Sequence, residues 1–361
     1  MNIEALARPE IVAMRPYSSA RKEAPGLGTL LNANEAPWSL LGESGWEGQL
    51  NRYPEPQPER LVSGMAQLYG VPESHVLVTR GSDEGIDLLT RVFCRAGQDA
   101  ILHCPPTFGM YRIAAQTQGA AIVAVARDSG GSFRLDERRL LDALDNDDRI
   151  RLVFLTSPNN FTGDVIEPQF LENLLGKCRD RALVVMDEAY AEFCSRTSAA
   201  ALLPGHDNLV VLRTLSKAWG AAGLRCGAVL AQPAVIDLLR RVIAPYPLPS
   251  PVIALALRVL QADVLVRQRQ MLRQIADNKQ LLLGVVKSRP FVHEVIAGHA
   301  NFVLLKVERA DDLLSFCARR NVILRGFPSE PLLRGYIRIS VGSATDIETL
   351  AAALDEWENQ A

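Results

Sequence analysis

Short apolar runs alternate with amphipathic segments over most of the chain. From residue 60, apolar side chains recur every three or four positions, as in Leu61, Met65 and Leu68, which predicts a helix that ends at Gly70. Continuous apolar runs such as 76–79 instead predict buried strands. The further strand candidates are 100–103, 121–125, 152–156, 183–186, 209–212 and 228–231. Strands separated by helices predict an α/β fold, in which a mostly parallel sheet is covered by helices on both faces.

The pattern changes after a proline-rich stretch at residues 245–251. A long helical segment extends to about residue 287, and three short strands are expected at 302–307, 322–325 and 336–341. We therefore expect a large α/β domain over residues 46–245, and an interdomain helix with a small α+β domain over residues 246–361. Residues 1–45 carry few periodic cues and are expected to form an arm that packs with the small domain.

Composition narrows the functional classes. The 39 basic and 41 acidic residues leave a net charge of −2 without a long basic run, so nucleic acid is not an expected partner. Six cysteines without a CxxC pair and five scattered histidines predict no metal centre and no disulfide framework. The first ten residues do not resemble a signal peptide, and no apolar run reaches the roughly 18 residues of a membrane span. A cytoplasmic protein is expected.

One lysine stands just beyond the end of a predicted strand. Lys217 follows the apolar run 209–212, with Thr214 and Ser216 before it and Arg225 eight residues later. The carboxyl ends of parallel strands are where α/β proteins commonly bind ligands. A lysine there suits an amine that forms an imine with a phosphate-bearing aldehyde. The alternative is an ordinary solvated lysine.

Polar side chains also follow two neighbouring strand candidates. Asp187 ends the run 183–186, where a carboxylate is costly unless it is paired. It could cap the next helix or hold a protonated pyridine nitrogen, in which case Tyr190 could lie on the same face and bond the ring's phenolic oxygen. Asn159 and Asn160 follow another strand; they are ordinary turn residues that could also give an amide to a cofactor oxygen.

Two further segments of the chain are candidate anion sites. Gly81, Ser82 and Asp83 connect a strand to a helix, where backbone N–H groups and the helix dipole favour an anion. The turn is not GxGxxG, and no P-loop is present, which disfavours dinucleotide and nucleoside-triphosphate enzymes. Arg325 and Arg338 belong to short apolar strand candidates, so each guanidinium either meets a carboxylate or phosphate or reaches solvent from an edge.

Together these motifs resemble those of the fold-type I pyridoxal-phosphate-dependent aminotransferases. The pairs Asp187 with Tyr190 and Ser216 with Lys217 are typical of that superfamily, and segments 213–227 and 243–248 resemble its histidinol-phosphate aminotransferase branch. The similarity extends over nearly the whole chain. The other matching segments are 31–35, 51–54, 80–85, 104–111, 157–163 and 338–342.

The resemblance implies a role for each matching residue. Lys217 would hold the cofactor and move a proton, Asp187 would hold the pyridinium proton, and Tyr190 would assist at the phenolic oxygen. The remaining cofactor residues would be Ser82, Asp83, Phe108, Asn160, Thr214, Ser216 and Arg225, with Tyr53 reaching the phosphate from a second subunit. The substrate would be received by Tyr17, Asn34, Arg325 and Arg338.

The same resemblance implies an obligate homodimer with shared sites, acting in histidine biosynthesis. It would convert L-histidinol phosphate and 2-oxoglutarate to imidazole-acetol phosphate and L-glutamate. Two alternatives share the motifs, namely an aromatic amino-acid aminotransferase and a pyridoxal-phosphate-dependent decarboxylase of a phosphorylated amino acid. A non-catalytic pyridoxal-phosphate-binding regulator would be expected to carry an effector domain, and the sequence offers no segment for one.

The chain departs from the family pattern at two positions. Phe108 stands where a tyrosine usually lies over the cofactor ring, which keeps stacking but removes a hydroxyl. Phe161 replaces a proline in Ser157–Gly163, which restores an N–H and leaves the orientation of Asn160 open. Neither change removes an ionisable group, so we expect reduced or altered activity at most.

Overall fold

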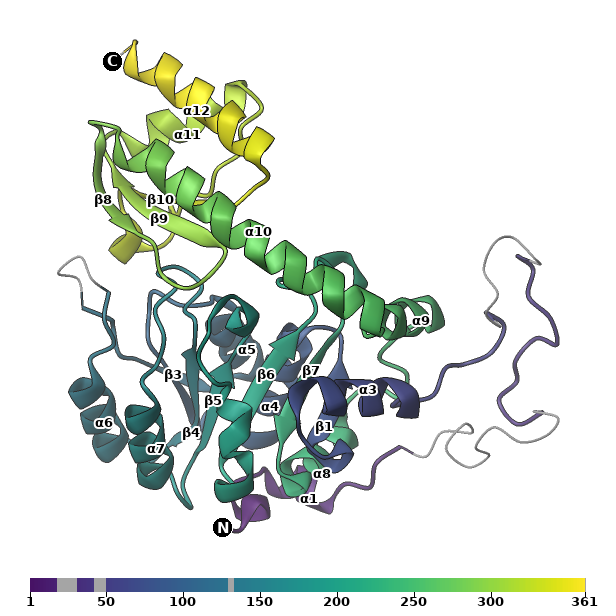
Figure 1. Cartoon of the computed structure of the whole chain (residues 1–361). Helices are drawn as coiled ribbons and strands as arrows, with labels where there is room; N and C mark the ends of the chain where they lie inside the picture. The colour runs from purple at the N-terminus through teal and green to yellow at the C-terminus, as the bar shows by residue number, and fades with distance from the viewer. Residues whose placement is uncertain (18–30, 42–49, 129–132, 361) are drawn as a thin grey trace.

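The computed structural model describes residues 1–17, 31–41, 50–128 and 133–360. A large unit is built around a seven-stranded sheet, and a smaller unit contains a three-stranded sheet (Figure 1). The helix α10 (Ala262–Lys287) runs from one unit to the other. Its last residue agrees with the end that the sequence predicts for the long helical segment.

The large sheet is mostly parallel, and the predicted α/β fold is confirmed. Its strand order is β1-β7-β6-β5-β4-β2-β3, in which β6, β5, β4, β2 and β3 are parallel. The strand β7 is antiparallel to both of its neighbours. The strands are β1 (Val76–Thr79), β2 (Ala100–His103), β3 (Ala121–Ala124), β4 (Ile150–Thr156), β5 (Leu183–Asp187), β6 (Leu209–Thr214) and β7 (Gly227–Ala231).

Successive strand residues face two different apolar cores. Val153 belongs to one buried cluster and its neighbour Phe154 to the other, since side chains alternate along a strand. Because helices cover both faces, the strands read as continuous apolar runs. One face carries α3 (Glu59–Tyr69), α6 (Glu137–Asn146), α7 (Pro168–Lys177) and α9 (Ser250–Val259), and the other carries α1 (Pro9–Ala13), α4 (Ser82–Phe93), α5 (Met110–Gln118) and α8 (Pro233–Val242).

The first residues pack against the large unit, which differs from the expected arm on the small domain. Ile3, Leu6 and Ile11 are buried in the core that also contains α4 and α8. The N–H of Arg8 donates to the carbonyl of Val92 at 2.9 Å, which fixes this segment at the end of α4. Its apolar stripe spans two short turns, too little for a period to be recognised in the sequence. Residues 18–30 and 42–45 of the expected arm lie outside the described residues.

The small sheet has the order β10-β9-β8 and is antiparallel. The predicted strand at 322–325 is wrong, because only Arg325 pairs there, in an isolated bridge to Arg338. An unpredicted strand, β8, forms an edge of the sheet. Two adjacent polar residues, His293 and Glu294, interrupt its apolar residues, so the strand does not appear as an apolar run in the sequence. The elements of this unit are β8 (Val292–Ile296), β9 (Phe302–Val307), α11 (Ala310–Arg319), β10 (Tyr336–Ser340) and α12 (Ala344–Glu358).

Each sheet has its own buried core. The core of the small unit joins α11, α12 and the second half of α10, whereas Leu248 and Ala256 belong to the core of the large unit. A domain boundary near residue 245 therefore stays a proposal. Across the described ranges, no helix is long and apolar enough to cross a membrane. The same ranges contain no group of three or more His, Cys, Asp or Glu side chains that could hold a metal ion.

Candidate active site

Three adjacent parallel strands end together and carry the candidate residues to one edge of the sheet. Thr156 at the end of β4 pairs with Asp187 at the end of β5, and Asp187 pairs in turn with Leu212 near the end of β6. The segments after these strands hold Asn160 and Lys217. The small sheet lies beyond this edge (Figure 1), so the candidate site is placed between the two units.

Asp187 is buried and held by hydrogen bonds. The hydroxyl of Tyr111 donates to its Oδ2 at 2.6 Å, and the N–H of Ala189 donates to its Oδ1 at 3.1 Å. The Tyr111 hydroxyl also lies 2.8 Å from that of Thr156. Burial raises the pKa of Asp187 to about 6, which the bond from Tyr111 partly offsets. A cation beside this carboxylate would stabilise its charged form.

Tyr111 is a functional candidate that was not predicted from the sequence. Its ring is fully buried and stacks on Phe154, with centroids 4.7 Å apart. The residue ends the matching segment 104–111, so the motif contained it without indicating its role. Only the packing of α5 on the sheet brings its hydroxyl to Asp187.

Lys217 lies next to Tyr190 and close to two arginines. Its Nζ is 5.7 Å from the centroid of the Tyr190 ring. The side chain retains exposure to solvent, yet the loss of water around its amine lowers its pKa. The positive charge of Arg338 adds to this effect, and the negative charge of Asp83 opposes it. A lowered pKa makes the neutral, nucleophilic amine more abundant near neutral pH.

The predicted anion cradle is assembled around Arg225. This residue donates from Nη1 to the hydroxyl of Ser216 and from Nη2 to the carboxylate of Asp83, each at 3.2 Å. Thr214 accepts from the N–H of Ser216 at 3.1 Å. The helix α4 begins at Ser82, so its amino-terminal N–H groups face the same place.

Gly81 allows this close approach. Its φ is +78°, and a Cβ there would lie 2.8 Å from Nη2 of Arg225. Any side chain at this position would be strained and would displace the guanidinium. The glycine therefore keeps a space open between the helix terminus and the arginine.

The predicted substrate arginines adjoin the Asn160 loop. Arg325 and Arg338 exchange two backbone hydrogen bonds. The two residues therefore lie directly across from each other in an antiparallel bridge. Arg338 donates through Nη1 to the backbone carbonyl of Asn160. The side-chain amide oxygen of Asn160 is buried and has no hydrogen-bond partner among the described residues. Such an orphaned group is what a bound cofactor would satisfy.

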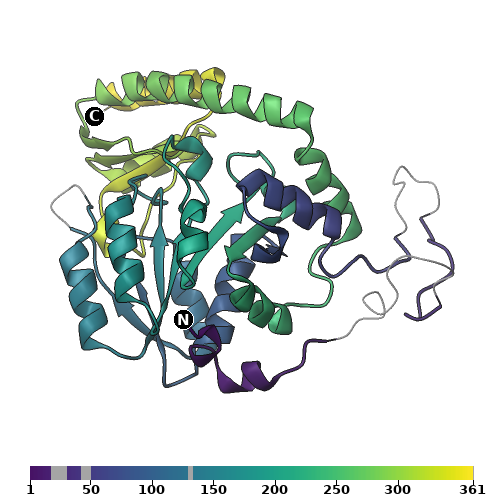
Figure 2. The same ribbon diagram turned by 60° about the horizontal axis from the view of Figure 1, so that its bottom comes forward.

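The remaining predicted residues lie further out in the single chain. Phe108 is partly buried and meets Tyr111 edge to face at 5.8 Å. Tyr53 is half exposed and stacks on Tyr246 at 4.6 Å. Tyr17 is 68% exposed, and Asn34 belongs to the segment 31–41, which stands away from both units (Figure 2). Within one chain, Asn34 therefore does not reach the strand ends.

The clustered residues fit pyridoxal phosphate, the cofactor that the motif resemblance implies. The cradle offers N–H and guanidinium donors to a phosphate. Asp187 offers a buried carboxylate to a ring cation, and Asn160 offers an unsatisfied amide. Lys217 offers an amine of lowered pKa. Each of these features has a counterpart on that cofactor.

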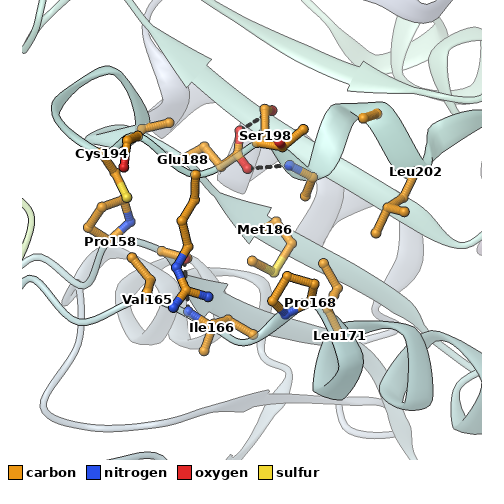
Figure 3. A pocket seen from close by; sticks show the side chains of 17 residues that line it. Pro158, Val165, Ile166, Pro168, Leu171, Met186, Glu188, Cys194, Ser198 and Leu202 are labelled. Atoms are coloured by element: carbon orange, nitrogen blue, oxygen red, sulfur yellow. Dashed lines mark hydrogen bonds between the residues drawn. The ribbon is translucent and has the colours of Figure 1, made fainter.

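A separate cavity of about 460 Å³ lies between the segment after β4 and the segment after β5 (Figure 3). Pro158, Met186 and Glu188 line it, and none of the predicted site residues does. The carboxylate of Glu188 accepts from Ser198, from the N–H of Ala199 and from Arg213, so its charge is already paired. Its contacts indicate a structural role in holding the segment after β5.

Comparison with known proteins agrees with these observations. The model of the family described as aminotransferase class I and II matches residues 32–355. A histidinol-phosphate aminotransferase of Cronobacter sakazakii is 41% identical over 358 residues, covering 98% of this chain and 97% of that protein. Among solved structures, the histidinol-phosphate aminotransferase of Clostridium acetobutylicum has a TM-score of 0.78 at 19% identity, covering 86% of this chain and 92% of that one. The enzyme of that name from Sinorhizobium meliloti, in complex with pyridoxal 5'-phosphate, has a TM-score of 0.76 at 21% identity, covering 86% and 83%. The chain belongs to the class I and II aminotransferase family.

Proposed function

We propose that this aminotransferase moves the amino group of L-histidinol phosphate to 2-oxoglutarate, giving imidazole-acetol phosphate and L-glutamate. One observation carries the proposal: Arg338 donates to the backbone carbonyl of Asn160, and its positive charge adds to the loss of water that lowers the pKa of Lys217. An anion-binding guanidinium and a reactive amine thus share one site. The similarity to histidinol-phosphate aminotransferases over nearly the full chain selects the substrate.

The family's cofactor, pyridoxal phosphate, supplies an electrophilic carbon and an electron-withdrawing ring when it is bound. Asp187 would keep the ring nitrogen protonated, because a cation beside a buried carboxylate lowers the cost of its charge. Asn160 and Tyr190 would hold the phenolic oxygen. Lys217 would bind the cofactor and then carry the proton from the carbon that bears the substrate amine. The cradle around Arg225 would hold the cofactor phosphate.

The arginine pair suits both substrates of the proposed cycle. Histidinol phosphate carries a phosphate and no carboxylate, whereas glutamate carries two carboxylates. A guanidinium can donate two parallel hydrogen bonds to either group. Arg325 and Arg338 can therefore receive the two substrates in turn at one site.

The proposal includes a homodimer. Leu31, Trp38 and Leu40 are 89%, 72% and 101% exposed, on a segment that stands away from both units (Figures 1 and 2). Large apolar side chains gathered on one exposed segment are typical of an interaction surface. A second copy of the chain would cover them and would bring Tyr53 to the partner's phosphate cradle. A cytoplasmic location belongs to the same proposal, because the phosphate of the substrate does not cross an apolar membrane.

An assay of three reactions tests the function. The cofactor-loaded protein should convert histidinol phosphate and 2-oxoglutarate with a kcat/KM at least a hundred times that for phenylalanine, since a site that binds a dianion discriminates strongly against a substrate that lacks it. Release of CO₂ from a phosphorylated amino acid would instead indicate the decarboxylase. A preference for phenylalanine would indicate the aromatic aminotransferase.

A further inference from the structure

Phe161 stands directly after Asn160, in the segment between β4 and α7. Its backbone N–H, which the family's usual proline lacks, donates to Oδ1 of Asn159 at 2.8 Å. The same oxygen accepts from the N–H of Thr162 at 3.2 Å, and Asn159 is fully buried. Two hydrogen bonds to Asn159 thus close the turn that a proline ring would otherwise stiffen.

The ring of Phe161 projects into an apolar cluster of the small unit. It meets Phe327 edge to face, with centroids 5.0 Å apart and planes at 67°. Apart from Phe161 and Phe133, the members of this cluster come from the small unit, so the ring joins the Asn160 loop to that unit. The other members are Ile296, Leu304, Phe327, Leu332, Leu333 and Tyr336.

The same ring also faces Arg338. The guanidinium carbon lies 5.9 Å from the centroid of Phe161, 5.8 Å from that of Phe327 and 5.0 Å from that of Phe302. These distances are within the range of cation–π attraction. Burial lowers the pKa of Arg338, so the guanidinium lacks water that the three rings partly replace. Its Nη1 is committed to the carbonyl of Asn160.

We propose that Phe161 is a positioning residue for anion recognition, whose ring fixes the Arg338 guanidinium and couples it to the loop of Asn160. The inference rests on the proposed function for the identity of the anion, a substrate phosphate or carboxylate. A fixed guanidinium loses less freedom when the anion binds, so affinity for the anion depends on the ring. The cofactor contacts of the loop are kept by Asn159 and do not depend on the ring.

Three substitutions separate the contribution of the aromatic ring from the contribution of apolar contact alone. Phe161→Ala should raise KM for both histidinol phosphate and 2-oxoglutarate about tenfold, and Phe161→Leu, which keeps apolar contact, about threefold. Phe161→Tyr retains the ring and should restore KM to within about twofold of wild type. In all three variants kcat should change by less than about twofold, and the visible absorption of the bound cofactor should not change.

Phe316→Leu is the matched control. Phe316 packs against the guanidinium of Arg320 at 3.6 Å, in the small unit but on α11. Its replacement removes the same kind of contact, so it should lower the melting temperature and leave both KM values unchanged. A Phe161→Ala protein that loses kcat and the cofactor absorption while keeping KM would overturn the proposal. Equal KM values for the leucine and tyrosine variants would overturn it as well.

A binding measurement makes the result independent of turnover. Calorimetry with 2-oxoglutarate on the cofactor-loaded protein should show a Kd about tenfold higher for Phe161→Ala than for wild type, and Phe316→Leu should bind as wild type does. If wild-type protein failed to convert histidinol phosphate, the proposed function would fail. The comparison of Kd values would still decide the role of Phe161. An unchanged Kd in the alanine variant would contradict it.

Discussion

At the scale of single residues, the candidate site places two ionisable side chains, Asp187 and Lys217, where their surroundings disfavour the charged form. Burial raises the pKa of Asp187, and partial loss of water around its amine lowers the pKa of the more exposed Lys217. Both shifts favour the neutral form of the side chain. A cofactor that brings a ring cation to Asp187 and an aldehyde to Lys217 uses both of these properties. In the cofactor-free chain, the charge of Asp187 therefore lowers the free energy of unfolding at neutral pH.

Replacement of Asp187 tests this cost. Its folded-state pKa of about 6 exceeds the ordinary 3.8, so the folded chain binds the proton more tightly, and stability falls as pH rises between these values. The cofactor-free Asp187→Asn protein should melt about 2 °C above wild type at pH 7, with the difference vanishing near pH 4. The loaded variant should lose at least a hundredfold in kcat. Thermal unfolding at both pH values checks the first expectation, and a lower melting temperature for the variant at pH 7 would contradict it.

At the scale of elements, two glycine-containing loops join the units at the site. The N–H of His299 donates to the carbonyl of Gly163 at 2.6 Å. Lys279 on α10 holds the loop from the other side, since its Nζ donates to the carbonyls of Gly298 at 2.9 Å and Ala300 at 2.6 Å. Gly298 has a φ of +45°, and a Cβ there would overlap the carbonyl oxygen of Thr162. The contact of the two units at this point therefore needs glycine.

Gly298→Ala should separate the loops. We expect a loss of more than about 2 kcal/mol in the free energy of unfolding, because strained backbone and a clash with main-chain atoms add together. KM for both substrates should rise, since Arg338 loses its place beside Asn160. Gly284→Ala is the control: it lies within α10 with nothing near its Cβ, and it should be neutral or stabilise by up to about 1 kcal/mol. Denaturant unfolding of both variants measures this, and equal stability would contradict the account.

The sequence predicted elements well where apolar runs were uninterrupted. The seven strands of the large sheet follow from such runs, and the end of α10 follows from the long helical segment. The edge strand β8 was missed because its pattern is half polar, and 322–325 was wrongly predicted because apolar residues there do not pair. In the candidate site, Asp187 and Lys217 were predicted because they lie at or just beyond the ends of predicted strands. The hydroxyl of Tyr111 could not be placed, since it meets Asp187 through packing across 76 positions of sequence.

At the scale of the whole molecule, the proposed active site needs residues from two chains. Tyr53 stacks on Tyr246 in the single chain, and exposed apolar side chains line the nearby segment 31–41. If Tyr53 serves the partner's site, each site draws residues from both chains. A closed two-fold dimer would place two such shared sites at one interface.

Mixed dimers test this arrangement. Lys217→Ala and Tyr53→Ala proteins should each be weakly active alone. Coexpressed in equal amounts, about half of the dimers would be hybrids, and each hybrid would have one intact site, so about a quarter of wild-type activity should return. Activity equal to the average of the two separate variants would mean that each chain forms its own site.

The most direct test of the central claim is where the cofactor is attached. The chain has six lysines, of which the account selects Lys217. Borohydride reduction of the loaded protein followed by peptide mapping should find the cofactor on Lys217, and the Lys217→Ala protein should lose turnover by at least a thousandfold. A cofactor fixed to another lysine, or a Lys217→Ala protein that turns over at the wild-type rate, would contradict the account.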